Sequence, residues 1–124
     1  MYKIKDMKKH DFNPRFRWGA ATSSFQIEGN IDADGKLESI WDRFCKTPGK
    51  IKDMEHAEAA CDHYNRWKED FDLLENLGVN SYRFSISWPR VVQSDLKQAN
   101  LKGIEYYDKI VDDLLTRNIG FLNQ

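Results

Sequence analysis

The sequence predicts an α/β fold, an incomplete (β/α)8 barrel that holds the first two β/α units and the start of a third. Strand-like and helix-like stretches alternate along the chain, which is typical of parallel β/α units. In the stretch 82–88 an aromatic face opposes a polar face of Arg83, Ser85 and Ser87. A polar interior suits the mouth of a barrel better than a flat sheet that is buried on both sides. The 124 residues fall short of the roughly 250 residues of a complete barrel.

The first third of the chain contains one strand-like and one short helical pattern. Residues 16–26 are apolar, small and aromatic, which predicts a buried strand that runs into a tight loop at 26–29. Residues 30–38 have the composition of a loop. Ser39 and Asp42 have the spacing of a capping box, which predicts a short helix that ends at 47–49.

The rest of the chain contains the most regular patterns. Apolar residues three or four apart predict a long helix over 55–77, with Gly78 at its C′ position. The period then changes to two, which predicts a strand over 82–88 that Pro89 ends. A second helix is predicted over 100–116 with Asn100 as its N-cap, and 119–122 begin a further strand.

Composition narrows the functional classes. The chain has 19 Lys and Arg against 20 Asp and Glu, a balance that argues against nucleic acid as a partner. Mean hydropathy is −0.73, and no apolar run approaches the ~18 residues of a membrane span. The basic start leads to no apolar stretch, so we expect no secretory signal and a cytoplasmic location. Cys45 and Cys61 lack metal-ligand spacing, so we expect reduced thiols, no metal and no cofactor.

Four motifs in a fixed order carry a family resemblance. Residues 16–29 read FRWGAATSSFQIEG, and SIWD at 39–42, ACDHYNRW at 60–67 and YRFSISWPR at 82–90 follow. Over about residues 12–119 the chain closely resembles glycoside hydrolase family 1, the β-glucosidase family. The resemblance implies a TIM barrel that hydrolyses terminal β-D-glucosides with retention, in carbohydrate catabolism. Residues 1–124 would be the N-terminal part of that domain, with 1–13 as a loose N-terminal segment.

The resemblance also indicates what the chain lacks. Asn30 replaces a small residue of the family, and residues 119–124 read IGFLNQ where the family continues into its third strand. Retaining hydrolysis needs two carboxyl groups about 5–5.5 Å apart. The family's acid/base and nucleophile glutamates belong to later strands, and Glu28 alone cannot form the pair. We therefore expect no catalytic residue in this chain and no activity from it alone.

Two site residues follow from the resemblance. Gln26 matches a glutamine that binds two adjacent hydroxyls of the sugar, for which its amide has both donors and an acceptor. Arg83 matches an arginine that lowers the pKa of the nucleophile and holds it in place. The structural alternatives are a Gln that satisfies loop backbone and an Arg that only packs. Core packing is expected for all four tryptophans, Trp18, Trp41, Trp67 and Trp88.

Three functional hypotheses remain open at this point. The first is part of a β-glucosidase, whose β-glucoside or oligosaccharide substrate binds in the complete barrel. The second is a non-catalytic carbohydrate-binding or interaction module that keeps Gln26. The third is one part of a split barrel that assembles with a separate chain. Residues 26–29, QIEG, resemble the β-glucosidase branch more than the 6-phospho-glycosidase branch.

Overall fold

The computed structural model describes residues 8, 11–95 and 97–123. Most of the predicted loose segment, namely residues 1–7 and 9–10, lies outside the described residues, so that prediction is untested.

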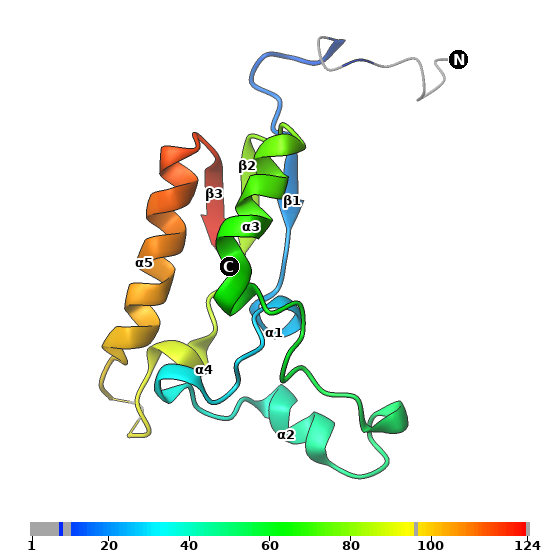
Figure 1. Ribbon diagram of the computed structural model, residues 1–124, viewed down its shortest axis with the longest axis vertical. Coiled ribbons are helices and arrows are strands. Elements are labelled where there is room, and N and C mark those ends of the chain that lie inside the picture. The colour runs from blue at the N-terminus through cyan, green and yellow to red at the C-terminus, as the bar shows by residue number, and fades with distance from the viewer. Residues whose placement is uncertain (1–7, 9–10, 96, 124) are drawn as a thin grey trace.

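Three parallel strands form a single sheet in the order β1 (Gly19–Ala21), β2 (Ser81–Phe84) and β3 (Gly120–Asn123). Arg83 of the central strand pairs with Ala21 on one side and with Leu122 on the other. All three strands therefore point the same way, and their carboxyl ends meet at one edge of the sheet (Figure 1). The predicted parallel β/α arrangement is confirmed.

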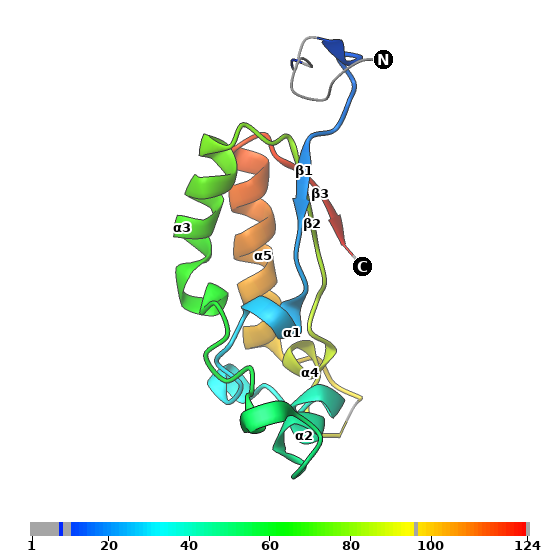
Figure 2. The ribbon, with the colours of Figure 1, turned by 90° about the vertical axis from the view of Figure 1, so that its right-hand side faces the viewer.

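Two long helices cover one face of this sheet, α3 (His63–Asn76) and α5 (Leu101–Thr116), as Figure 2 shows. No described helix covers the opposite face. Within the described part of the chain, none of the helices has the length and apolarity needed to cross a membrane. The core lies between the helices and the sheet and consists of Phe71, Leu74, Tyr82, Phe84, Tyr106, Tyr107, Ile110, Leu114 and Ile119.

Short helices gather beyond the carboxyl ends of the strands (Figure 1). The capping box predicted for the second of them is present, since Ser39 Oγ accepts from the Asp42 N–H at 3.0 Å and Asp42 Oδ2 accepts from the Ser39 N–H at 2.8 Å. The short helices are α1 (Ser24–Ile27), α2 (Ile40–Lys46), α4 (Trp88–Val91) and two 3₁₀ helices, η3 (Ala33–Gly35) and η4 (Lys52–Met54).

The first predicted strand is shorter than expected. Only Gly19–Ala21 pair with β2, and the last residues of the predicted strand form α1. The backbone leaves the sheet because the N–H of Ser24 bonds to the Ser85 side chain at 2.8 Å instead of to a strand. A side chain that accepts from the backbone in this way competes with ladder pairing.

The predicted long helix over 55–77 begins only at His63. Ala60 and Asp62 have positive φ angles of 48° and 55°, which place them in the left-handed region. Non-glycine residues in that conformation interrupt a right-handed helix, and residues 55–62 form bends, a turn and irregular chain instead. The C-terminal end is as predicted, with Gly78 at φ 67° after the last helical turn.

The strand predicted over 82–88 ends at Phe84, and residues from Trp88 onward form α4. Pro89 lies in the first turn of α4, where its missing N–H costs nothing. Ile86 and Trp88 therefore do not extend the aromatic core face and are 38% and 66% exposed. For Tyr82 and Phe84 the predicted core face is confirmed.

The second predicted helix is confirmed as α5, but its N-cap works differently from the prediction. The side chain of Asn100 does not bond to the first N–H groups of the helix. Its Nδ2 donates instead to the carbonyl oxygens of Arg90 at 2.8 Å and Asp34 at 2.7 Å. Asn100 thus ties the start of α5 to α4 and η3.

Candidate functional site

The carboxyl edge of the sheet is the natural place for a site in this fold. In parallel α/β folds, ligands bind beyond the carboxyl ends of the strands, where the strand-to-helix segments meet. Here the segments after β1 and β2 lie at that edge together with α1, α2 and α4 (Figure 1).

Gln26 lies on α1 and not at the end of a strand as predicted. Its backbone N–H bonds to the carbonyl oxygen of Ser23 at 3.0 Å, which closes the single helical turn. Its side chain is exposed, and it makes no hydrogen bond with another residue of the described ranges. Within the described ranges, the side-chain amide of Gln26 therefore bonds to no loop backbone.

Arg83 lies in the middle of β2, on the face of the sheet away from the helices. Tyr82 and Phe84 on either side are buried in the core, whereas Arg83 is exposed. The alternation of β2 therefore places the guanidinium on the open face, which corresponds to the interior in a barrel. Gln26 follows β1, whose last residue, Ala21, pairs with Arg83 of β2.

A buried polar cluster lies beside these residues and was not predicted as a unit from the sequence. Glu28 follows α1 directly, and its carboxylate pairs with Nε of Arg90 at 3.0 Å. The hydroxyl of Tyr107 donates to the other carboxylate oxygen at 2.6 Å. The side chain of Arg90 is 0% exposed and that of Glu28 is 6% exposed. This cluster therefore connects the end of α1 to α4 and α5.

Burial dominates the electrostatics of this cluster. Burial raises the pKa of the Glu28 carboxyl above its ordinary value, while the Tyr107 hydroxyl and Arg90 oppose that shift. Burial also raises the pKa of Tyr107, and the negative charge of Glu28 adds to the effect. The hydroxyl therefore stays protonated and remains a donor to Glu28 at neutral pH.

Gly103 is the sequence feature that could have indicated this cluster. This glycine interrupts the apolar stripe of α5, three and four residues before Tyr106 and Tyr107. A Cβ at this position would lie 1.9 Å from the carbonyl oxygen of Arg90. The glycine permits the close approach of α4 and α5 that brings Arg90 to Glu28.

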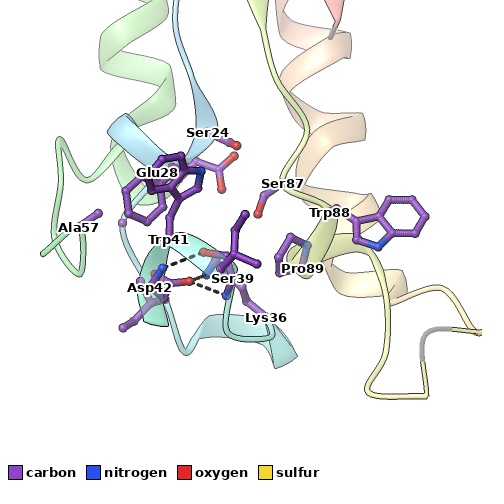
Figure 3. Close-up of a pocket in the computed structure, with 14 residues that line it drawn as sticks. Ser24, Glu28, Lys36, Ser39, Trp41, Asp42, Ala57, Ser87, Trp88 and Pro89 are labelled. Carbon is purple, nitrogen blue, oxygen red and sulfur yellow. Dashed lines mark hydrogen bonds and ion pairs between the residues drawn. The ribbon is translucent and has the colours of Figure 1, made fainter. Parts of the chain in front are cut away.

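A cavity of about 350 Å³ opens beside the cluster, between α1, α2 and α4 (Figure 3). Asp42 and Lys36 form a buried ion pair at 3.1 Å on its wall. Trp41 and Trp88 also line it and are 54% and 66% exposed, so the prediction of core packing is wrong for these two tryptophans in this chain. The described ranges contain no group of three or more His, Cys, Asp or Glu side chains that could hold a metal ion.

Comparison with known proteins places the chain among glycosidases. The model of glycosyl hydrolase family 1 matches residues 8–122. β-Glucosidase A of Thermotoga maritima is 50% identical over 113 residues, 91% of this chain and 25% of the relative. The β-glucosidase of an Agrobacterium species is 49% identical over 84% of the chain and 23% of the relative. An aryl-phospho-β-D-glucosidase of Bacillus subtilis is 44% identical over 87% of the chain and 23% of the relative.

Solved structures show the same similarity. The Thermotoga maritima β-glucosidase in complex with castanospermine superposes with a TM-score of 0.87 at 49% identity, over 90% of this chain and 26% of that one. The family 1 β-glucosidase of Exiguobacterium antarcticum gives 0.87 at 44% identity, over 90% of this chain and 25% of that one. The chain therefore spans about a quarter of the length of the proteins that it matches.

Proposed function

The chain belongs to glycosyl hydrolase family 1, and from that premise we propose that it supplies the N-terminal part of a β-glucosidase barrel and part of its sugar-binding site. The observation that carries the proposal is the exposed amide of Gln26 at the carboxyl edge of the sheet. It occurs in a chain that is 50% identical to a β-glucosidase over 91% of its length.

The chemistry of Gln26 supports a role in binding and not in bond cleavage. A primary amide has one acceptor oxygen and two N–H donors, so it can bond to two neighbouring hydroxyls of a pyranose at once. It does not titrate, so it can neither protonate a leaving group nor attack the anomeric carbon. Solved structures of the Thermotoga maritima β-glucosidase contain castanospermine and deoxynojirimycin, sugar-like inhibitors that support a glycoside as the ligand class.

Cleavage itself is proposed to depend on residues outside these 124. Retaining hydrolysis uses one carboxyl group as the acid and a second as the nucleophile, about 5–5.5 Å apart. The Glu28 carboxylate is buried and already bonded to Arg90 and Tyr107, so it cannot serve as either. In the complete barrel Arg83 would lie near the nucleophile and keep it ionised, because a neighbouring cation lowers a carboxyl pKa.

The proposal also covers where the protein is located and what kind of partner it binds. We infer a cytoplasmic location, which the free thiols of Cys45 and Cys61 support, since disulfides are rare in reducing compartments. The balanced charge supports a small-molecule substrate, with no role for nucleic acid or membrane binding.

A hybrid barrel tests the proposal. It joins residues 1–122 to the part of the Thermotoga maritima β-glucosidase that follows the matched region. We expect this hybrid to hydrolyse an aryl β-glucoside, and we expect Gln26→Ala to lower kcat/KM about tenfold. The loss corresponds to two hydroxyl contacts of ~0.5–1.5 kcal/mol each.

Gln98→Ala is the matched control, because Gln98 is also an exposed glutamine but lies in the loop before α5. Melting curves of the three proteins establish that all are folded at the assay temperature. A change of less than twofold for Gln26→Ala in a folded hybrid would contradict the proposed role.

Arg83→Met in the hybrid barrel is expected to shift the acid limb of the kcat/KM profile to higher pH by about one unit. The nucleophile must be ionised to react, and loss of the nearby cation raises its pKa, so activity disappears at a higher pH as the solution is acidified. Arg43→Met, an exposed arginine of α2, is the control. An acid limb that stays in place would assign Arg83 a purely structural role.

A further inference from the structure

We propose that Glu28 is a positioning residue that holds Gln26 in place through Tyr107 and Arg90. The inference rests on the proposed role of Gln26 in sugar binding. Glu28 itself is buried, two residues beyond Gln26, so it acts through the backbone and touches no substrate.

The element that carries Gln26 cannot hold its own position. α1 contains four residues, which is far below the length at which a helix is stable on its own. Its orientation is therefore set by whatever holds its two ends. At the N-terminal end, the N–H of Ser24 bonds to Oγ of Ser85 in the segment after β2, at 2.8 Å.

Glu28 holds the other end from two directions. Its carboxylate accepts from Nε of Arg90 on α4 at 3.0 Å and from the hydroxyl of Tyr107 on α5 at 2.6 Å. The same hydroxyl accepts the N–H of Ser87 at 2.7 Å. Both ends of α1 are thus fixed to the segment that follows β2, and Gln26, whose side chain is exposed, lies between these two ends in the chain.

The ion pair between Glu28 and Arg90 fixes the local backbone geometry more than it stabilises the fold. Arg90 is fully buried, and its Nη1 has no hydrogen-bond partner within the described residues. Its Nη2 donates to the carbonyl oxygen of Gly29 at 3.2 Å, directly beside Glu28. A buried ion pair with an unpaired N–H gains little over apolar side chains of the same volume. Its directional contacts nevertheless restrict the backbone at residues 28 and 29 to one position.

A double-mutant cycle in the hybrid barrel tests this role. Tyr107→Phe removes the hydroxyl that joins Glu28 to Ser87 and keeps the ring. We expect it to lower kcat/KM about fivefold when Gln26 is present and less than twofold in the Gln26→Ala background. Glu28→Gln is the second variant and is expected to show the same dependence on Gln26.

Tyr106→Phe is the matched control. The hydroxyl of Tyr106 is buried and has no partner in the described ranges, so its removal should leave kcat/KM unchanged. Equal losses in both backgrounds would show that Tyr107 and Glu28 are only structural, and an unchanged kcat/KM for both variants would also overturn the inference. If Gln26→Ala alone has no effect, the proposed sugar contact fails instead, which keeps the two failures distinct.

Discussion

Gly103→Ala is expected to destabilise the hybrid barrel strongly, although a change from glycine to alanine inside a helix normally stabilises it by about 1 kcal/mol. The new Cβ would lie 1.9 Å from the carbonyl oxygen of Arg90 and 2.7 Å from its carbonyl carbon. Both atoms belong to the backbone, so no side-chain rotation can relieve the contact. α4 and α5 would have to separate, and this would break the ion pair between Arg90 and Glu28.

The expected cost of that change is about 3 kcal/mol or more, in the range of severe overpacking and of broken buried ion pairs. Differential scanning calorimetry should show a fall in melting temperature of about 5 °C or more. Lys109→Ala, on the exposed side of the same helix, is the control and should change the melting temperature little. A melting temperature that is unchanged or higher for Gly103→Ala would mean that α4 and α5 are not packed as described.

The 124-residue chain by itself is expected to bind a hydrophobic dye, to melt without a sharp transition and to show no hydrolysis of an aryl β-glucoside. The face of the sheet opposite α3 and α5 has no described helix over it, whereas parallel sheets are normally buried on both faces. β1 and β3 each have one neighbour in the described sheet, so one edge of each strand is unpaired. The large apolar side chains that are more than half exposed are Ile40, Trp41, Met54, Leu73, Leu77, Trp88, Leu101 and Leu115.

The test is a thermal melt followed by near-UV circular dichroism. The sample is a monomer verified by light scattering. The isolated chain should lack the fixed tertiary signal of its tyrosines and tryptophans, and the dye should respond to its apolar surface. The hybrid barrel is the control, because the same residues then have a complete sheet around them. A sharp cooperative transition above ~60 °C would show that residues 1–124 form a self-sufficient domain, and would favour the binding-module hypothesis.

Much of the fold was predictable because local signals agree with the tertiary contacts. The capping box of Ser39 and Asp42, the C′ position of Gly78 and the amphipathic stripe of α5 each fix a helix boundary or face by short-range physics. The alternation of Tyr82, Arg83 and Phe84 likewise predicted which side of β2 is buried. Each of these features depends only on residues that lie within a few positions of one another in the chain.

The sequence-based predictions are wrong where hydrogen bonds from residues far away in the chain fix the backbone conformation. Nothing local predicts that the N–H of Ser24 bonds to Ser85, 61 residues away, and thereby turns the end of a predicted strand into α1. The left-handed conformation of Asp62 likewise goes with hydrogen bonds from the side chains of Asn30 and Asn65, of which Asn30 is 32 residues away. Propensity favoured a longer strand and a longer helix, and tertiary contacts overrode it.

The sequence by itself predicted the parallel β/α architecture through its periodicity and indicated the family through the order of its motifs. The resemblance to that family is what singled out Gln26 and Arg83 as site candidates. Only the tertiary structure decided how Gln26 is held. Glu28, Arg90 and Tyr107 look like unrelated charged and aromatic residues in the sequence, and 79 residues separate the first from the last. Their burial in one cluster arises from the close packing of α4 on α5, and such low-dielectric contacts between distant segments leave no periodic signal in a sequence.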